Sequence, residues 1–179
     1  MRTTANVSLA LSLAALLGGA LPLLSCTDPV LDARIASLGP EVGTPGPNHR
    51  PGQPCCVCHS EFGTDPKHIF TVAGTVFDSP TSLNPVPDVE VRLVSADNKG
   101  IVKLTNASGN FYLTEAEYPF AFPLRVRLSK GAVEKSMQSH IGREPSCAGC
   151  HFDPPNVGEG RVHYTAFQAV GHVYFSAGP

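Results

Sequence analysis

The 179-residue chain has no tryptophan, and only 16% of its residues are charged. Its 13 Lys and Arg are scattered among 15 Asp and Glu and form no basic run. Because a nucleic-acid surface needs concentrated positive charge, nucleic acid is not an expected partner. The sequence also lacks an HExxH zinc motif, a glycine-rich phosphate loop and a Ser/His/Asp order. We therefore do not expect an enzyme that uses one of these mechanisms.

The cysteines carry the clearest signal. Residues 55–59 and 147–151 both read C-x-x-C-H, in a chain with six cysteines in all. This is the attachment motif of a c-type haem, because two thiols three positions apart can each add to one vinyl group of the haem. The predicted attachment residues are Cys55, Cys58 and His59 at the first site, and Cys147, Cys150 and His151 at the second. We therefore predict two haem c groups, with His59 and His151 as axial ligands of the irons.

A low-spin electron carrier needs a second axial ligand, usually His or Met. We predict His68 for the first haem, since it follows His59 by nine residues. For the second haem we predict His140, with Met137 as its competitor, because both precede Cys147 closely. His163 and His172 are reserve ligands. An open sixth position would instead allow a peroxidase or oxygenase.

Residues 1–25 have the features of an export signal: a positive residue at Arg2, an apolar run over 7–24 and a small residue, Ser25, before Cys26. The end of this segment, Leu23-Leu24-Ser25-Cys26, resembles the lipobox of bacterial lipoproteins. The resemblance implies that Cys26 is lipidated, and the Thr27 that follows implies the outer rather than the inner membrane. A plain secretory signal is the alternative. Export fits the haem motifs, since c-type haem is attached outside the cytoplasm.

The remaining 154 residues suit one compact domain with appendages. A Pro/Gly-rich tether over 26–54 leads to a first haem-binding segment, 55–69. Residues 70–138 contain short alternations of apolar and polar residues between turn signals, which predict an antiparallel β-sandwich. The second haem-binding segment, 139–179, includes possible final strands at 161–167 and 171–175. The predicted fold is mainly β, with a small sandwich flanked by two loop-rich C-x-x-C-H segments.

Three stretches of the predicted sandwich resemble the carboxypeptidase regulatory-like domain: Ala73-Gly74-Thr75-Val76, Pro87-Asp88-Val89-Glu90-Val91 and Asn106-Ala107-Ser108-Gly109-Asn110-Phe111. That family is a transthyretin-like sandwich with no catalytic residues, so the resemblance implies scaffolding or recognition. The whole arrangement is similar to exported bacterial cytochrome-like lipoproteins in which such a sandwich precedes a C-terminal C-x-x-C-H segment. It implies a membrane-anchored dihaem electron carrier that meets redox partner proteins.

Two other uses of the cysteines remain open. The four motif thiols can form one tetrahedral zinc site if the motifs meet in space. They can also form disulfides, which persist in exported proteins. In either case the chain would be a binding or adhesion lipoprotein built on the sandwich. Cys56 has no assigned role in any of these interpretations.

Overall fold

A computed structural model describes residues 28–41, 44–152 and 171–176. The export signal, the lipidation residue Cys26, the reserve ligand His163 and the strand expected over 161–167 lie outside the described residues. Within the described part of the chain, no helix has both the length and the apolar character needed to cross a membrane.

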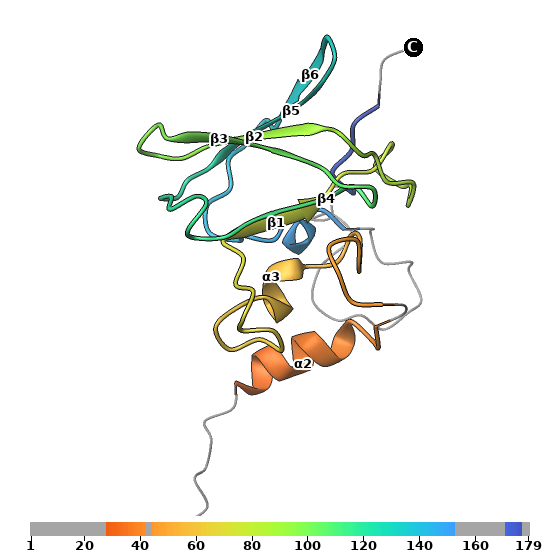
Figure 1. Cartoon of the computed structure of the whole chain (residues 1–179), viewed down its shortest axis with the longest axis vertical. Coiled ribbons are helices and arrows are strands. Elements are labelled where there is room, and N and C mark those ends of the chain that lie inside the picture. Colours follow the sequence, from red (N-terminus) through yellow and green to blue (C-terminus); the bar gives the residue numbers. More distant parts are fainter. Residues whose placement is uncertain (1–27, 42–43, 153–170, 177–179) are drawn as a thin grey trace, which may run out of the picture.

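The protein is mainly β, as predicted, and consists of two antiparallel sheets (Figure 1). The smaller sheet pairs β1 (Val72–Thr75) with β4 (Asn110–Leu113). The larger sheet has the order β3-β2-β5-β6. Its strands are β2 (Glu90–Val94), β3 (Gly100–Leu104), β5 (Arg125–Lys130) and β6 (Val133–Ser136). All six strands lie inside the predicted sandwich.

The core lies between the two sheets. Val91 and Leu93 of β2 are fully buried, whereas the alternating residues Glu90 and Arg92 are exposed, as expected for a strand with one face toward solvent. Phe111 and Leu113 of β4 complete the opposite side of the same apolar cluster.

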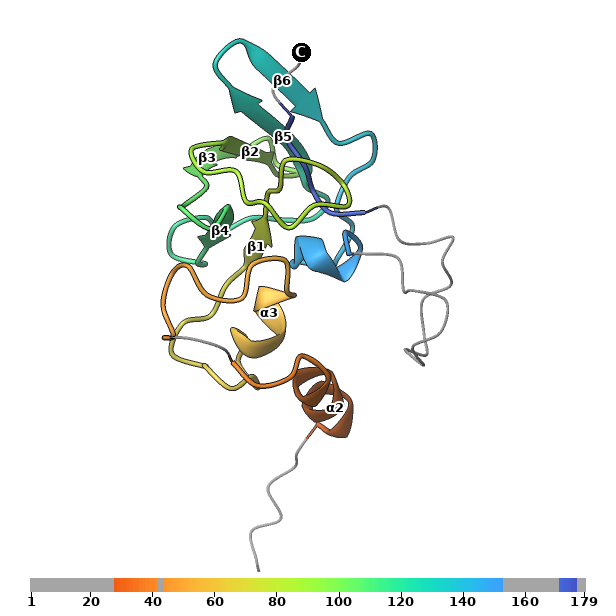
Figure 2. The same cartoon turned by 90° about the vertical axis from the view of Figure 1, so that its right-hand side faces the viewer.

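Strand β1 differs from β2, because all four of its residues are buried. One of its faces belongs to the core. The short helix α3 (Cys55–Cys58) contacts β1, and the N–H of Gly52 just before it donates to the Thr75 hydroxyl at 2.8 Å. The 3-10 turn η1 (Cys147–Gly149) follows a segment that pairs with the edge of β1, where the N–H of Ala73 donates to Pro145 O at 3.0 Å. Figures 1 and 2 show these turns packed beneath the sandwich, on the side away from β6. The sandwich thus serves as a platform for both motifs.

The predicted tether contains the helix α2 (Pro29–Ser37), which lies beside α3 in both views (Figures 1 and 2). Its start is set by Asp28, whose carboxylate accepts from the backbone N–H groups of Val30 and Leu31 at 3.0 and 3.1 Å. Pro29 occupies the first turn, where a missing N–H costs nothing. The tether therefore folds back against the first haem-binding segment.

The C-terminal segment 171–176 runs along Phe77, just beyond β1. The N–H of Phe77 donates to Val173 O at 2.9 Å, and the N–H of Phe175 donates to Phe77 O at 2.8 Å. This pairing is a single β-bridge between Phe77 and Tyr174, not the strand expected over 171–175. It holds the chain end against the platform.

Candidate haem-attachment sites

Both motifs adopt the same kind of local turn, although they lie in unrelated parts of the sequence. In the first, the N–H of His59 donates to Cys55 O at 2.9 Å; in the second, the N–H of His151 donates to Cys147 O at 2.8 Å. Each turn leads directly to its histidine. Cys55 and Cys58 line one cavity, whereas Cys147 packs against the core and Cys150 is exposed.

The two histidines are also oriented alike. His59 Nδ1 lies 3.0 Å from His68 O, and His151 Nδ1 lies 3.1 Å from Gly171 O. Because a carbonyl oxygen only accepts, Nδ1 must carry the proton in both rings, and the neutral ring keeps its lone pair on Nε2. Metal-binding histidines are commonly oriented through the opposite nitrogen in this way.

Burial lowers the pKa of His59 and of His151 below the usual range. The backbone carbonyl bonded to each ring works in the opposite direction, as does Asp65 in the case of His59, but burial is the larger cause. Both rings are therefore neutral near pH 7, which is the form that binds a metal.

The His59 ring is fixed from several sides. It stacks on Phe70, with ring centroids 4.2 Å apart, and Phe70 stacks on Tyr112 at 4.6 Å. Asp65 Oδ2 lies 3.5 Å from His59 Nδ1 and 2.8 Å from His68 Nδ1. These contacts leave the imidazole little rotational freedom.

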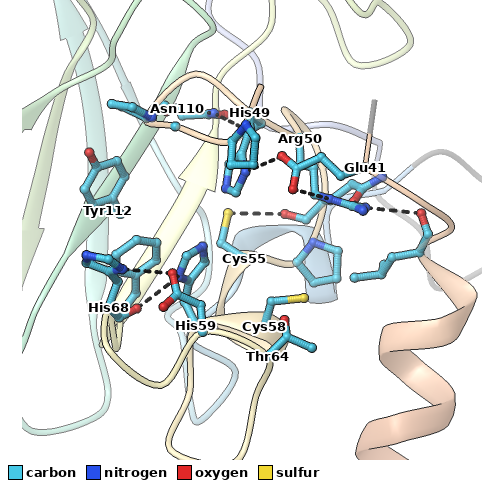
Figure 3. A pocket seen from close by; sticks show the side chains of 18 of the residues that line it. Glu41, His49, Arg50, Cys55, Cys58, His59, Thr64, His68, Asn110 and Tyr112 are labelled. Carbon is cyan, nitrogen blue, oxygen red and sulfur yellow. Dashed lines mark hydrogen bonds and ion pairs between the residues drawn. The ribbon is translucent and has the colours of Figure 1, made fainter. Parts of the chain in front are cut away.

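A cavity of about 730 Å³ opens on the first motif (Figure 3). Its walls come from α3, from the tether after α2 and from the β4 side of the small sheet. The lining includes Cys55, Cys58, His59, Phe70, His49 and Arg50. Cofactor pockets measure about 300–1,000 Å³ and are mostly apolar. A neutral imidazole and two thiols on one wall of such a cavity are what a covalently attached haem requires, so the residues of the first site fit the group.

The second motif lies against β1 and the C-terminal segment. Gly74 of β1 makes room for Cys147, since a Cβ at Gly74 would stand 2.6 Å from the Cys147 sulfur. Gly171, whose carbonyl oxygen accepts from His151 Nδ1, is followed by the buried His172. His172 Nδ1 lies 2.9 Å from Ser82 O, and its ring lies 4.6 Å from that of Phe77. The second site therefore depends on residues far away in the sequence.

The two motifs touch each other. The N–H of Cys56 donates to the hydroxyl of the buried Ser146 at 2.9 Å. Burial raises the pKa of Cys147 to about 12, and the nearby thiols of Cys55 and Cys56 add to the shift. Cys56 is absent from the cavity lining that contains Cys55 and Cys58. It therefore lies at the junction between the motifs, a position that its sequence alone did not reveal.

The predicted second ligands lie in different surroundings. The backbone of His68 supports His59, while its 69%-exposed side chain pairs with Asp65 at 2.8 Å. Met137 follows β6 and bonds through its N–H to Val126 O at 3.0 Å, and His140 is exposed. Within the described part of the chain, no hydrogen bond or ring contact joins the side chain of His140 or Met137 to the second motif. These ligand assignments stay predictions.

Sequence reasoning missed His49 and its partner Glu41, which face the first cavity from the tether. The one available signal was the position of His49, six residues before Cys55. Nothing local marks Glu41, because its pairing with His49 depends on how the tether folds back.

Neither of the alternatives, a zinc site or disulfides, is assembled among the described residues. The five described cysteines form no disulfide with one another. The same residues contain no group of three or more His, Cys, Asp or Glu side chains placed to hold a metal ion. A haem needs no such group, because a single histidine beside two thiols is the protein's minimum contribution.

Comparison of the chain with protein-family models, with curated proteins and with solved structures finds no match. The functional argument therefore depends on the chain's own residues and their geometry.

Proposed function

We propose that this protein is an extracytoplasmic dihaem c-type cytochrome-like electron carrier. The observation that carries the proposal is the repeated geometry of the two motifs. In each, the N–H of the histidine closes a helical turn on the first cysteine and a backbone carbonyl holds Nδ1 of the histidine, at 3.0 Å for His59 and 3.1 Å for His151. The bond leaves Nε2 of each motif histidine as the nitrogen with the lone pair, and the same orientation at both sites supports a common purpose.

A bound haem c would supply one-electron redox chemistry at each site. Cys55 and Cys58 would form the thioethers of the first haem, and Cys147 and Cys150 those of the second. Attachment adds each S–H across a vinyl group, so it requires no oxidant. His59 and His151 would each bind iron through Nε2, while the apolar cavity wall around His59 limits access of water.

The contact between the motifs supports a transfer role. Cys56 and Ser146 join the two turns directly at 2.9 Å, so two haems attached there would be close neighbours. Electrons could then enter at one haem and leave at the other. The sandwich would hold both in fixed relation and offer its outer faces to a redox partner protein.

The membrane association belongs to the same proposal. The lipobox-like sequence ending at Cys26 supports a lipid anchor, and Thr27 favours the outer membrane. The folded tether, with α2 against α3, would then keep the first haem site close to the anchored end of the chain.

The test is the haem content of the exported, matured full-length protein, measured by pyridine haemochrome spectrum and intact mass. We expect two covalent haems per chain, one fewer in Cys55→Ser/Cys58→Ser, and one fewer in Cys147→Ser/Cys150→Ser. Zero haem, in a host that matures a control c-type cytochrome, would overturn the proposal. Bound zinc or disulfide masses in that haem-free protein would then identify the binding lipoprotein.

A further inference from the structure

We propose that His49 is the second axial ligand of the first haem and that Glu41 positions it. This inference rests on the proposed function, because it concerns the same cavity. The proposed second ligand is therefore His49, on the cavity wall formed by the tether, and not His68, which the sequence predicted.

His49 and His59 face the same cavity from different elements (Figure 3). His59 follows α3, whereas His49 lies on the loop between α2 and α3, above the Cys55 thiol in the view of Figure 3. Their ring centroids are 5.7 Å apart, with the planes inclined by 57°. Two imidazoles that bind one metal through nitrogens at about 2 Å have ring centres roughly 6 Å apart. The observed separation therefore suits a shared iron after a small side-chain adjustment.

The tautomer of His49 is set by Glu41. His49 Nδ1 lies 2.6 Å from Glu41 Oε1, and since a carboxylate accepts, Nδ1 is the protonated nitrogen. Nε2 has no hydrogen-bond partner among the described residues. A carboxylate on the outer nitrogen is a frequent support of metal-binding histidine and raises the basicity of the ligand.

The backbone around His49 is anchored independently of any cofactor. Asn110 Nδ2 donates to His49 O at 2.9 Å, and the Asn110 side chain is itself held by the Thr75 hydroxyl at 2.7 Å. The neighbouring Arg50 donates to Gly39 O at 2.9 Å and to Gln53 Oε1 at 2.7 Å. The wall that carries His49 is thus tied to both sheet strands β1 and β4 and to the end of α2.

His68 is placed less well for the same role. Its carbonyl accepts the Nδ1 proton of His59, so its backbone lies behind the ring and not across the cavity from it. Its side chain is 69% exposed and pairs with Asp65. His68 is therefore the support of the proximal ligand, and His49 is the residue that faces it.

The experiment compares His49→Ala, His49→Met and the matched control His68→Ala in the matured full-length protein. Haem count by pyridine haemochrome reports on the proposed function, while optical and electron paramagnetic resonance spectra report on the axial ligand. We expect His49→Ala to retain both haems but to convert one from low spin to high spin, with added imidazole restoring low spin. His68→Ala should stay low spin at both haems.

His49→Met keeps a side chain at this position that can still bind iron, but changes the ligand from an imidazole to a thioether. A thioether ligand raises the reduction potential of a haem, so one of the two potentials should rise while both haems stay low spin. Glu41→Gln should keep both haems low spin and raise the same potential, because His49 becomes a less basic ligand without the carboxylate. Retention of two low-spin haems in His49→Ala, or conversion to high spin in His68→Ala, would overturn the inference while leaving the haem count, and hence the proposed function, intact. A haem-free wild-type protein would overturn both.

Discussion

Gly74 is a position at which the sandwich and the second motif lie close together, and it offers a sharp test of their coupling. A Cβ at this position would lie 2.6 Å from the Cys147 sulfur, 2.8 Å from its Cβ and 3.0 Å from Phe111 Cε1. Favourable contacts between such atoms occur at about 3.5–4.0 Å. In Gly74→Ala, η1 must therefore move away from β1 by roughly 1 Å.

The expected size of the effect follows from two opposed contributions. Overpacking a buried site costs about 1–3 kcal/mol, whereas replacing glycine by alanine in a compatible backbone gains about 0.4–1 kcal/mol through the unfolded state. The net loss for Gly74→Ala should be about 1–2 kcal/mol. With a urea slope of about 2 kcal/mol/M, the unfolding midpoint falls by about 0.5–1 M.

The matched control is Gly100→Ala in β3, where the nearest atoms to an added Cβ, Leu93 O and Val94 Cγ2, lie at 3.7 and 3.8 Å. Urea unfolding of the haem-free protein should show a lower midpoint for Gly74→Ala alone. Displacing η1 should also expose Cys147, so its alkylation should accelerate while that of Cys58 does not. Equal midpoints and equal alkylation rates in the two variants would refute the idea that β1 positions the second motif.

Two further predictions concern the junction and the buried histidines. Ser146→Ala should cost about 1–3 kcal/mol, because the half-buried N–H of Cys56 loses the hydroxyl of the buried Ser146 as its acceptor. Ser129→Ala, which removes an exposed hydrogen bond to Glu90, should leave the urea midpoint almost unchanged, and a similar loss in both variants would contradict the assigned bond. The haem-free protein should lose stability as pH falls below about 6.5, the ordinary histidine value, because the lowered pKa of His59 and His151 makes the unfolded chain bind more protons there. Urea midpoints at about pH 7.5 and pH 5.5 measure this, and a midpoint that does not fall at the lower pH would speak against buried neutral rings.

The strands were predictable because their signal is local. Alternation at Val89, Val91 and Leu93 reflects one buried face, and the structure confirms β2 there. Turn residues such as Asn106 and Gly109 separated the strands correctly. The helix α2 lies within the segment that composition predicts to be a tether, although Asp28 followed by Pro29 is a recognisable start signal.

The site was only partly predictable. The motif residues could be named from their spacing, which is a local property. The surroundings of His59 could not be predicted, because Glu41 and His49 line the cavity only after a Pro/Gly-rich segment without a periodic pattern has folded against it. Composition predicted an extended tether there, whereas hydrogen bonds from Asn110 and Arg50 hold the described part of that segment against the sandwich.

The closeness of the two motifs is a consequence of β1. Cys58 and Cys147 are separated by 88 residues, so no local rule relates them. Both are brought together because the sandwich begins shortly after the first motif and ends shortly before the second, and both motifs pack against β1. A strand buried on both faces is unusual in a small antiparallel sheet, where one face is commonly left to solvent. Here α3 contacts β1, the segment before η1 pairs with its edge, and Cys147 packs against the core, so the residues that would carry the haems also complete the packing around β1. A substitution that changes the packing at Gly74 should therefore also change the reactivity of Cys147. This would not be expected if the sandwich only held the two motifs apart.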